Sequence, residues 1–259
     1  MKLLFLADVV GPAGRRAVEE NLPALRERHD ADLAIVNGEN IADGVGITPK
    51  LADKLLAAGA DVVTLGNHTY RRSGIAGYLA ASERVIRPAN QGTLTPGNAM
   101  AVVEARNGVR VAVLNLLGQL FLDTPVSPWE MVDTLVEEAC AAAPVVFLDF
   151  HGEATSEKVA MATWLDGRVT AVVGTHTHVQ TSDARVLPGG TAAITDAGMT
   201  GPHDSVIGVK AELAIQRMRT GIPVRFETAE GGVRLEGALL ECDGSGRATS
   251  CETFRVSVD

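Results

Sequence analysis

The sequence predicts an α/β fold in which buried strands lie between helices. Through the first two thirds of the chain, short apolar runs alternate with amphipathic segments of helical period. This alternation is typical of strands that are covered on both faces by the helices connecting them. The 259 residues are 46% hydrophobic and 21% charged, close to the average for globular proteins. No repeat, low-complexity segment or long linker divides the chain, so we predict one domain over residues 1–259.

The individual elements follow in regular order. The first apolar run, LLFLAD at residues 3–8, precedes a Gly-Pro helix start and a periodic helical segment. Further strand-like runs are residues 33–40, 61–68, 144–153 and 169–178, and helix-like runs are residues 48–59, 128–142 and 154–165. Residues 99–117 indicate two strands around the Asn107-Gly108 turn, a strong hairpin signal. The tail from about Val224 is expected to be β-structure with glycine turns.

Composition excludes several classes of protein. Asp8 interrupts the first apolar run, so we interpret this run as a buried strand rather than a signal peptide. No apolar run approaches the roughly 18 residues that cross a bilayer, and we expect a soluble protein without a membrane partner. The net charge of −9 disfavours a broad grip on long DNA or RNA. A negative net charge does not exclude binding of a small anion at a local site.

Cysteine usage indicates the compartment. The chain has three cysteines, an odd number, and no CxxC pattern. This usage favours reduced thiols and a cytoplasmic location. Cys242 and Cys251 could face each other in a C-terminal hairpin, but we do not expect a disulfide. The sequence leaves the oligomeric state open, a homo-oligomer included.

Residues able to bind a metal or move a proton follow five of the apolar runs. In extended backbone, residues two apart point the same way, so the two histidines of GTHTH can reach toward one place. In chain order, the candidates are Asp8, then Glu39 and Asn40, then Asn67 and His68, then His151, and finally His176 and His178. In open α/β sheets, ligands bind beyond the carboxyl ends of the strands, so these side chains are expected to converge.

Taken alone, each candidate also has a structural explanation. Asp8 could cap the following helix, and Glu39, Asn40 and Asn67 could be turn residues. His151 could be a hydrogen-bonded core histidine. Chance, however, would rarely end five separate strands with ligand-type residues. The joint pattern therefore favours a metal site.

The types of ligand restrict the choice of metal. Three imidazoles, two carboxylates and carboxamides, without a thiolate, suit borderline divalent ions rather than calcium. We expect iron or manganese, with zinc as the alternative. Six or seven ligands are too many for one tetrahedral ion. Two ions about 3.5–4 Å apart, bridged by a carboxylate and a water, would use them all.

The motifs also resemble a known family. Asp8, GEN at 38–40, GNH at 66–68, His151 and GTHTH at 174–178 resemble the calcineurin-like metallophosphoesterase pattern. More narrowly, the run from DVVGPAGR through NGENIADGVGIT, TLGNH, LDFHGEATSEK and VVGTHTHVQT to TDAGMTGPHDSVIG is similar to the YmdB-like bacterial phosphodiesterases. This resemblance implies a four-layer α/β/β/α sandwich of the metallophosphoesterase type. It also implies hydrolysis of phosphodiesters such as 2′,3′-cyclic nucleotides, with 3′,5′-cyclic nucleotides as further candidates.

The resemblance implies a role for each candidate, with one ligand shared by two ions. One ion would take Asp8, Glu39, Asn40 and His178, and the other would take Glu39, Asn67, His151 and His176. His68 would be the acid near the leaving group, and a metal-bridging hydroxide would attack phosphorus. The chain departs from the wider superfamily at Val10, where many members have a metal-binding histidine, and at Glu39, where they have a bridging aspartate.

Other functions stay open at this point. A phosphomonoesterase or protein phosphatase could use the same two metals. CapA-like proteins of capsule synthesis share GNH and H-x-H-V-x-Q elements, and amidohydrolase barrels also use H-x-H, although on their first strand. A metal-dependent regulatory binding protein with little turnover is the alternative from a different class. The sequence does not identify the physiological substrate or a role for His203 in the GMTGPHDS loop.

Overall fold

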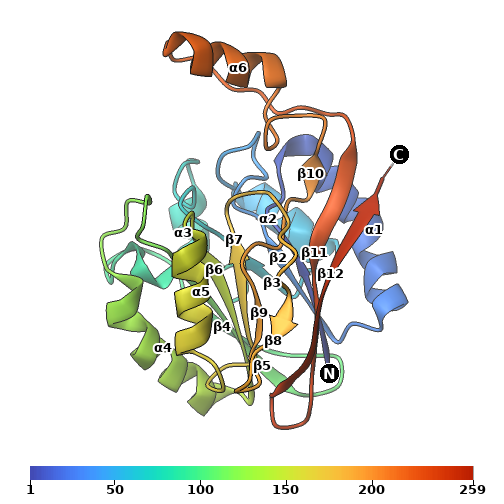
Figure 1. Cartoon of the computed structure of the whole chain (residues 1–259), viewed down its shortest axis with the longest axis vertical. Coiled ribbons are helices and arrows are strands. Elements are labelled where there is room, and N and C mark those ends of the chain that lie inside the picture. The colour runs from blue at the N-terminus through green and yellow to red at the C-terminus, as the bar shows by residue number, and fades with distance from the viewer. Residues whose placement is uncertain (259) are drawn as a thin grey trace.

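Two β-sheets lie face to face at the centre of the structure, and helices cover their outer faces (Figure 1). The structure is a computed structural model that describes residues 1–258; Asp259, the last residue of the predicted domain, lies outside the described residues. The order of layers is helices, sheet, sheet, helices. The predicted α/β/β/α sandwich is therefore confirmed.

The first sheet is parallel on one side and antiparallel on the other. Its strands, in spatial order, are β10 (Gly201–Pro202), β11 (Val233–Cys242), β1 (Lys2–Leu6), β2 (Leu33–Asn37) and β3 (Val62–Thr64). Strands β1, β2 and β3 are parallel, whereas β11 runs antiparallel to β1. The last strand, β12 (Ala248–Ser257), forms a hairpin with β11.

The second sheet has a parallel centre and an antiparallel strand at each edge. Its strands, in spatial order, are β4 (Met100–Glu104), β5 (Arg110–Leu117), β6 (Val145–His151), β7 (Ala171–Thr175), β9 (Ala192–Ile194) and β8 (Arg185–Val186). Strands β5, β6, β7 and β9 are parallel. Strand β4 pairs with β5 through the predicted Asn107-Gly108 hairpin.

The helices divide between the two outer faces. Those that pack on the first sheet are α1 (Gly11–His29), α2 (Pro49–Ala57) and α3 (Ile75–Ala81), and those on the second are α4 (Pro128–Ala142) and α5 (Thr155–Trp164). A short 3₁₀-helix spans Ala89–Gln91. Helix α6 (Ala211–Thr220) instead projects away from the sandwich (Figure 1). No helix within residues 1–258 is long and apolar enough to cross a membrane.

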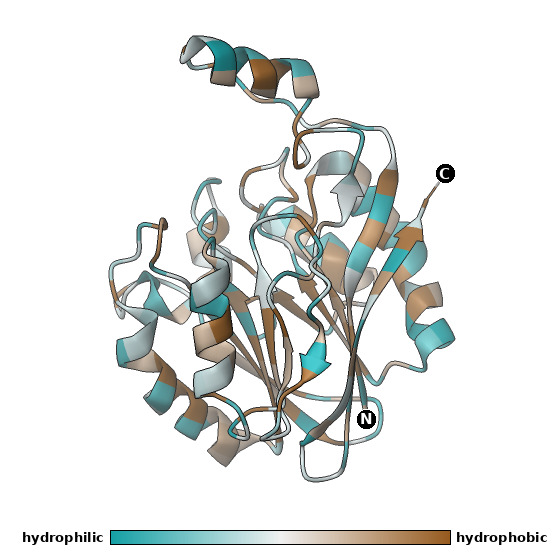
Figure 2. Cartoon of the chain, in the orientation of Figure 1, coloured by the Kyte–Doolittle hydropathy of each residue, from teal (hydrophilic) through white to brown (hydrophobic). Residues whose placement is uncertain are grey.

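Alternation along the strands separates three apolar cores. Leu3 and Phe5 of β1 face the second sheet, whereas Leu4 and Leu6 face the helices. Phe5 meets Phe147 of β6 across the sandwich, with ring centroids 5.3 Å apart. Because both faces of these strands are buried, their sequences are continuously apolar, as Figure 2 shows for the central strands.

Most predicted elements are present. The structure also has elements that the sequence did not predict, and these are short or peripheral. We did not expect α3, α6 or the short strands β8, β9 and β10. The predicted C-terminal hairpin is β11 and β12, but its register pairs Cys251 with Leu240 and Cys242 with Ala248. The two thiols are thus not opposite each other in the hairpin, and all three cysteines are free.

The carboxyl ends of the two sheets meet at one edge of the sandwich. Asn37, at the end of β2, donates from Nδ2 to Asp149 Oδ2 in β6 at 2.9 Å. Thr64, at the end of β3, donates to the same carboxylate oxygen at 2.5 Å. The sandwich therefore brings both sets of strand ends to the place where the sequence predicts a metal site.

Two helical glycines offer a matched test of the packing. An alanine Cβ at Gly14 of α1 would clash with the carbonyl oxygen of Thr200, whereas a Cβ at Gly77 of α3 would have no atom within 4 Å. We expect Gly14→Ala to lower the free energy of unfolding by about 1–3 kcal/mol. Gly77→Ala is expected to raise it by about 0.5–1 kcal/mol, because alanine has the higher helix propensity. Urea unfolding measures both, and changes of the same sign would contradict the close packing of α1.

Candidate metal centre

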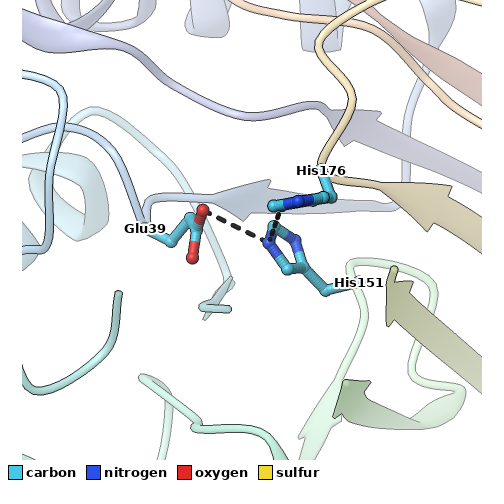
Figure 3. Close-up of side chains that lie close together, drawn as sticks. All are labelled: Glu39, His151 and His176. Carbon is cyan, nitrogen blue, oxygen red and sulfur yellow. Dashed lines mark hydrogen bonds and ion pairs between the residues drawn. The ribbon is translucent and has the colours of Figure 1, made fainter. Parts of the chain in front are cut away.

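Three ligand-type side chains meet at the carboxyl edge of the strands (Figure 3). Glu39 lies just beyond β2, His151 ends β6, and His176 directly follows β7. One ligand atom from each lies within 4.8 Å of the others. The Nε2 atom of His151 is 3.2 Å from Glu39 Oε1 and 3.0 Å from His176 Nδ1.

The surroundings of this imidazole nitrogen suit a cation. The side-chain oxygen of Asn67 also lies 3.0 Å from His151 Nε2, so three potential ligand atoms surround one nitrogen. If His151 Nε2 carries a proton, its single N–H cannot donate well to three partners at once. If it carries none, it is an acceptor and cannot satisfy a lone pair on His176 Nδ1. A divalent ion among these atoms would be a partner for all four.

Asp8 adds a second observation in favour of a cation. Its Oδ2 accepts a hydrogen bond from the backbone N–H of His176 at 2.8 Å. Its Oδ1 is buried and has no hydrogen-bond partner, and His151 Nδ1 is 4.0 Å from it. A buried carboxylate oxygen without a partner is costly, and a metal ion would satisfy it. The residues present therefore fit a metal site.

Asn40 and His178 stand beside this group. Asn40 Nδ2 is 2.9 Å from Glu39 Oε1 and 3.1 Å from His178 Nε2, while its Oδ1 is 2.8 Å from His68 Nδ1. In this orientation the amide nitrogen of Asn40, not its oxygen, faces His178. To bind an ion through Oδ1, the side-chain amide of Asn40 would have to rotate by half a turn. This rotation exchanges Oδ1 and Nδ2, which are similar in size.

A hydrogen-bond relay fixes the tautomer of His151. The hydroxyl of Thr175 donates to Asp149 Oδ1 at 2.7 Å, and His151 Nδ1 lies 2.9 Å from the same hydroxyl oxygen. Because the single hydroxyl proton is directed to Asp149, the oxygen accepts from His151 Nδ1–H. The Nε2 atom is then the one that can bind a metal, an arrangement found at many metal-bound histidines.

A buried ion pair holds the loop that carries the two other histidines. Lys158 Nζ is 2.8 Å from Asp196 Oδ2, and both side chains are buried. The same carboxylate oxygen accepts from Thr177 N at 3.0 Å and Thr177 Oγ1 at 2.7 Å. Thr177 separates His176 and His178, whose φ angles of 103° and 64° are unusual for residues other than glycine. The ion pair therefore stabilises a strained backbone.

The pKa values in the site reflect burial and mutual charge. Burial raises the pKa of Asp8 to about 6. Burial alone would raise the pKa of Glu39, but His151 and His68 hold it well below its usual range. Burial opposes the charge on His151, yet Glu39 outweighs it and raises the pKa of His151 to about 9. Burial and the nearby positive charge of His151 lower the pKa of His176 to about 3. The carboxylates and imidazoles of the site thus share few protons among closely placed, buried groups, and a bound cation would change all of these pKa values.

A cavity of about 430 Å³ opens onto these residues. The lining includes Glu39, Asn40, His68, His176 and His178 of the predicted site. The other predicted residues, Asp8, Asn67 and His151, lie behind or beside this lining. The structure therefore brings all eight predicted residues to one place, with His68 on the cavity side.

Four supporting residues were not predicted: Asp149, Lys158, Thr175 and Asp196. The sequence does hold a signal for Asp149, because an aspartate within the apolar run VVFLDF must have buried partners. The other three have no comparable signal, since their roles depend on contacts distant in sequence.

Comparison with known proteins identifies the family. The sequence pattern described as YmdB-like protein matches residues 4–254. The chain belongs to the YmdB-like family. A Bacillus subtilis (strain 168) member, named 2′,3′-cyclic-nucleotide 2′-phosphodiesterase, is 46% identical over all of this chain and 98% of its own length.

Two solved structures are similar over almost the whole chain. A hypothetical protein from Thermus thermophilus is 40% identical, has a TM-score of 0.93 and is matched over 99% of both chains. A novel phosphatase from Mycoplasma pneumoniae is 35% identical, with a TM-score of 0.89, over 99% of this chain and 93% of its own. These similarities confirm the predicted family, and the two-sheet architecture excludes an amidohydrolase barrel.

Family membership and the ligand cluster together indicate the chemical class. The protein is a hydrolase of the metallophosphoesterase type, and its site suits divalent metal ions.

The relay from Thr175 predicts an effect on metal binding. Thr175→Val removes the hydroxyl between His151 and Asp149 while keeping a similar volume, so the tautomer of His151 is no longer fixed. We expect the affinity for Mn²⁺ to fall about 10- to 100-fold, as when comparable partners of ligand histidines are removed. Titration of metal-stripped protein measures this, with Thr175→Ser as the control that keeps the hydroxyl. Equal affinities for both variants would refute the relay.

Proposed function

We propose that the protein is a phosphodiesterase that hydrolyses small phosphodiesters, 2′,3′-cyclic nucleotides first among them and 3′,5′-cyclic nucleotides as further candidates. The observation that carries the proposal is the group of buried and half-buried carboxylate and imidazole side chains beside a cavity of about 430 Å³. The name of the Bacillus subtilis relative, identical at 46% of positions, supports this choice of substrate.

We propose that two divalent ions, iron or manganese with zinc as the alternative, bind per chain. Asp8, Asn40 and His178 would hold one ion, Asn67, His151 and His176 the other, and Glu39 would bridge them. When bound, such ions activate a water at neutral pH and neutralise the phosphoryl oxygens. The position of Glu39 supports a bridging role, because its Oε1 lies near both Asn40 Nδ2 and His151 Nε2.

His68 has the position of an acid for the leaving oxygen. Its backbone N–H donates to Glu39 Oε2 at 3.1 Å, and its Nδ1 lies 2.8 Å from Asn40 Oδ1. If the amide of Asn40 turns over to bind an ion through its oxygen, its Nδ2 donates to His68 Nδ1, so the proton of a neutral His68 lies on Nε2, beside the cavity that this residue lines. We propose that Nε2 donates a proton to the departing ribose oxygen.

The charges around the cavity favour a diester over a monoester. Its lining residues, all within residues 1–258, include Asp43 and Glu153 but no lysine or arginine, and Glu227, which also lines it, is paired with Lys210 outside the lining. A phosphodiester has one negative charge, whereas a phosphomonoester has up to two near neutral pH and would be repelled more strongly. The net charge of −9 likewise disfavours long nucleic acid. The three free cysteines support the predicted cytoplasmic location.

One assay tests the proposal against its alternatives. Protein with its metal content determined is given 2′,3′-cyclic AMP, bis-p-nitrophenyl phosphate and p-nitrophenyl phosphate. We expect turnover of both diesters and a much lower kcat/KM for the monoester. Faster hydrolysis of the monoester would support a phosphomonoesterase. Stabilisation of the fold by a nucleotide without any product would support a regulatory binding protein.

The metal stoichiometry tests the bridge. Glu39→Ala should lose both ions and nearly all activity, because a bridging carboxylate serves two centres. Asn67→Ala is the matched control, since it removes one neutral oxygen ligand and should lower the occupancy of one ion only. Elemental analysis of the purified variants measures this. A Glu39→Ala variant that keeps two ions, or fully active wild-type protein with one ion, would refute the binuclear arrangement.

Substitution of His68 separates proton donation from metal binding. A ribose alkoxide is a poor leaving group, and a positioned acid typically contributes about 10²–10⁴-fold, whereas p-nitrophenolate needs little help. His68→Ala should keep its metals, lose about 10²-fold or more on 2′,3′-cyclic AMP, and lose distinctly less on bis-p-nitrophenyl phosphate. His29→Ala, which does not affect the lining of the cavity, is the control. Equal losses on both substrates would show that His68 is not the acid.

A further inference from the structure

The lining of the cavity includes apolar residues that the proposed chemistry does not use. Val45, Ile207 and Phe226 line it and keep exposed fractions of 38%, 53% and 39%. Single exposed apolar residues are common, but here three from separate segments line one cavity that also contains the ligand cluster. We call these three residues the apolar wall.

Two residues of the apolar wall lie in the two chain segments that flank helix α6. We call α6 and these segments the excursion, and the two segments its limbs. Ile207 precedes α6 and Phe226 follows it, and Figure 1 shows α6 projecting beyond them. A β-bridge between Val209 and Thr228 joins the limbs, and Lys210 Nζ pairs with Glu227 Oε2 at 2.7 Å. The limbs are therefore fixed at the rim of the cavity, although α6 extends away from it.

The backbone at Ile207 connects the apolar wall to the metal site. Ile207 has a φ of 47°, a left-handed conformation that is unfavourable for a β-branched residue. His178 Nδ1 lies 3.0 Å from its carbonyl oxygen, and Asn40 Nδ2 donates toward His178 Nε2, so Nδ1–H is the donor to Ile207. One strained residue thus orients a predicted ligand and presents an apolar side chain to the cavity. Such strain points to a functional role.

The ring of Phe226 packs against an arginine of α6 on one of its faces. The guanidinium carbon of Arg217 in α6 lies 5.1 Å from the centroid of its ring, which is a cation–π geometry. The ring also lines the cavity, where it offers apolar surface to a flat aromatic group.

We propose that the apolar wall binds the base of a nucleotide substrate, with Phe226 and Ile207 as the residues that determine specificity. The inference rests on the proposed phosphodiesterase function, because the phosphate would have to lie at the ligand cluster. A volume of about 430 Å³ is in the range of sites for ligands of this size. The occupant is a nucleoside cyclic monophosphate, which combines one anionic phosphate with one aromatic base.

The test compares two substrates that share the same reacting group. Glycerol 1,2-cyclic phosphate has the five-membered cyclic phosphate of 2′,3′-cyclic AMP but no base. We expect wild-type protein to prefer 2′,3′-cyclic AMP. Phe226→Ala should raise KM for 2′,3′-cyclic AMP about tenfold, the size of effect seen when a base-stacking aromatic is removed, and leave kcat/KM for glycerol cyclic phosphate unchanged.

Further variants separate recognition from structural damage. Phe226→Tyr should retain the preference for the nucleotide, and Ile207→Asn should reduce it, because asparagine tolerates the left-handed backbone but is polar. Phe121→Ala is the matched control, since Phe121 is 87% exposed and does not line the cavity. Equal kcat/KM of the wild type for both substrates, or equal losses on both in Phe226→Ala, would overturn the inference.

A binding measurement keeps this inference distinct from the proposed activity. Calorimetry with adenosine 3′-monophosphate requires no turnover, and we expect its Kd to rise about tenfold in Phe226→Ala. If metal-loaded protein hydrolyses neither substrate but binding still depends on Phe226, the proposed activity fails and the base site stands. If both substrates are hydrolysed but Phe226 has no effect on KM or Kd, the base site fails and the activity stands.

Discussion

The contact between Glu39 and His151 is the interaction on which the rest of the site depends. One residue comes from each sheet, both side chains are fully buried, and their nearest atoms are 3.2 Å apart. A buried carboxylate is tolerated only with full compensation. Asn40 Nδ2 and the backbone N–H of His68 supply the other hydrogen bonds to Glu39. Movement of the two sheets relative to each other would break this compensation, so the geometry of the site and the packing of the sandwich are coupled.

Asp149 extends this coupling from the site into the sandwich. Its carboxylate accepts from Asn37 of β2, Thr64 of β3 and Thr175 of β7, while Asp149 itself belongs to β6. Burial raises its pKa, and the nearby charge of His151 and these three hydrogen bonds oppose that shift. One carboxylate thus joins both sheets and, through Thr175, orients His151. Replacing such a network requires several simultaneous changes, because a partly satisfied buried network is costly.

The sequence predicted what periodicity and topology determine, and not what depends on particular long-range contacts. Alternating apolar runs were sufficient for the main strands and helices, and the strand-end rule was sufficient to bring Asp8, Glu39 and His151 together. Helix α6 was not predicted because it packs against little: Ala214 is its only buried residue within the described chain, so it has no clear apolar stripe. The pairing of Lys158 with Asp196 joins residues 38 positions apart, which no local pattern indicates.

The two parts of the cavity differ in how firmly the fold holds them. The ligand cluster stands on buried strand ends, where a displacement would disturb three apolar cores. Ile207 and Phe226 lie in the segments that flank α6, outside the two sheets, where one β-bridge, one exposed ion pair, the Arg217–Phe226 contact and the hydrogen bond from His178 to Ile207 hold them; exposed ion pairs contribute little stability. Changes in the excursion therefore cost the fold less than changes at the strand ends. On physical grounds, the chemistry of this site is constrained by the sandwich, while its selectivity for the organic part of a substrate is free to vary.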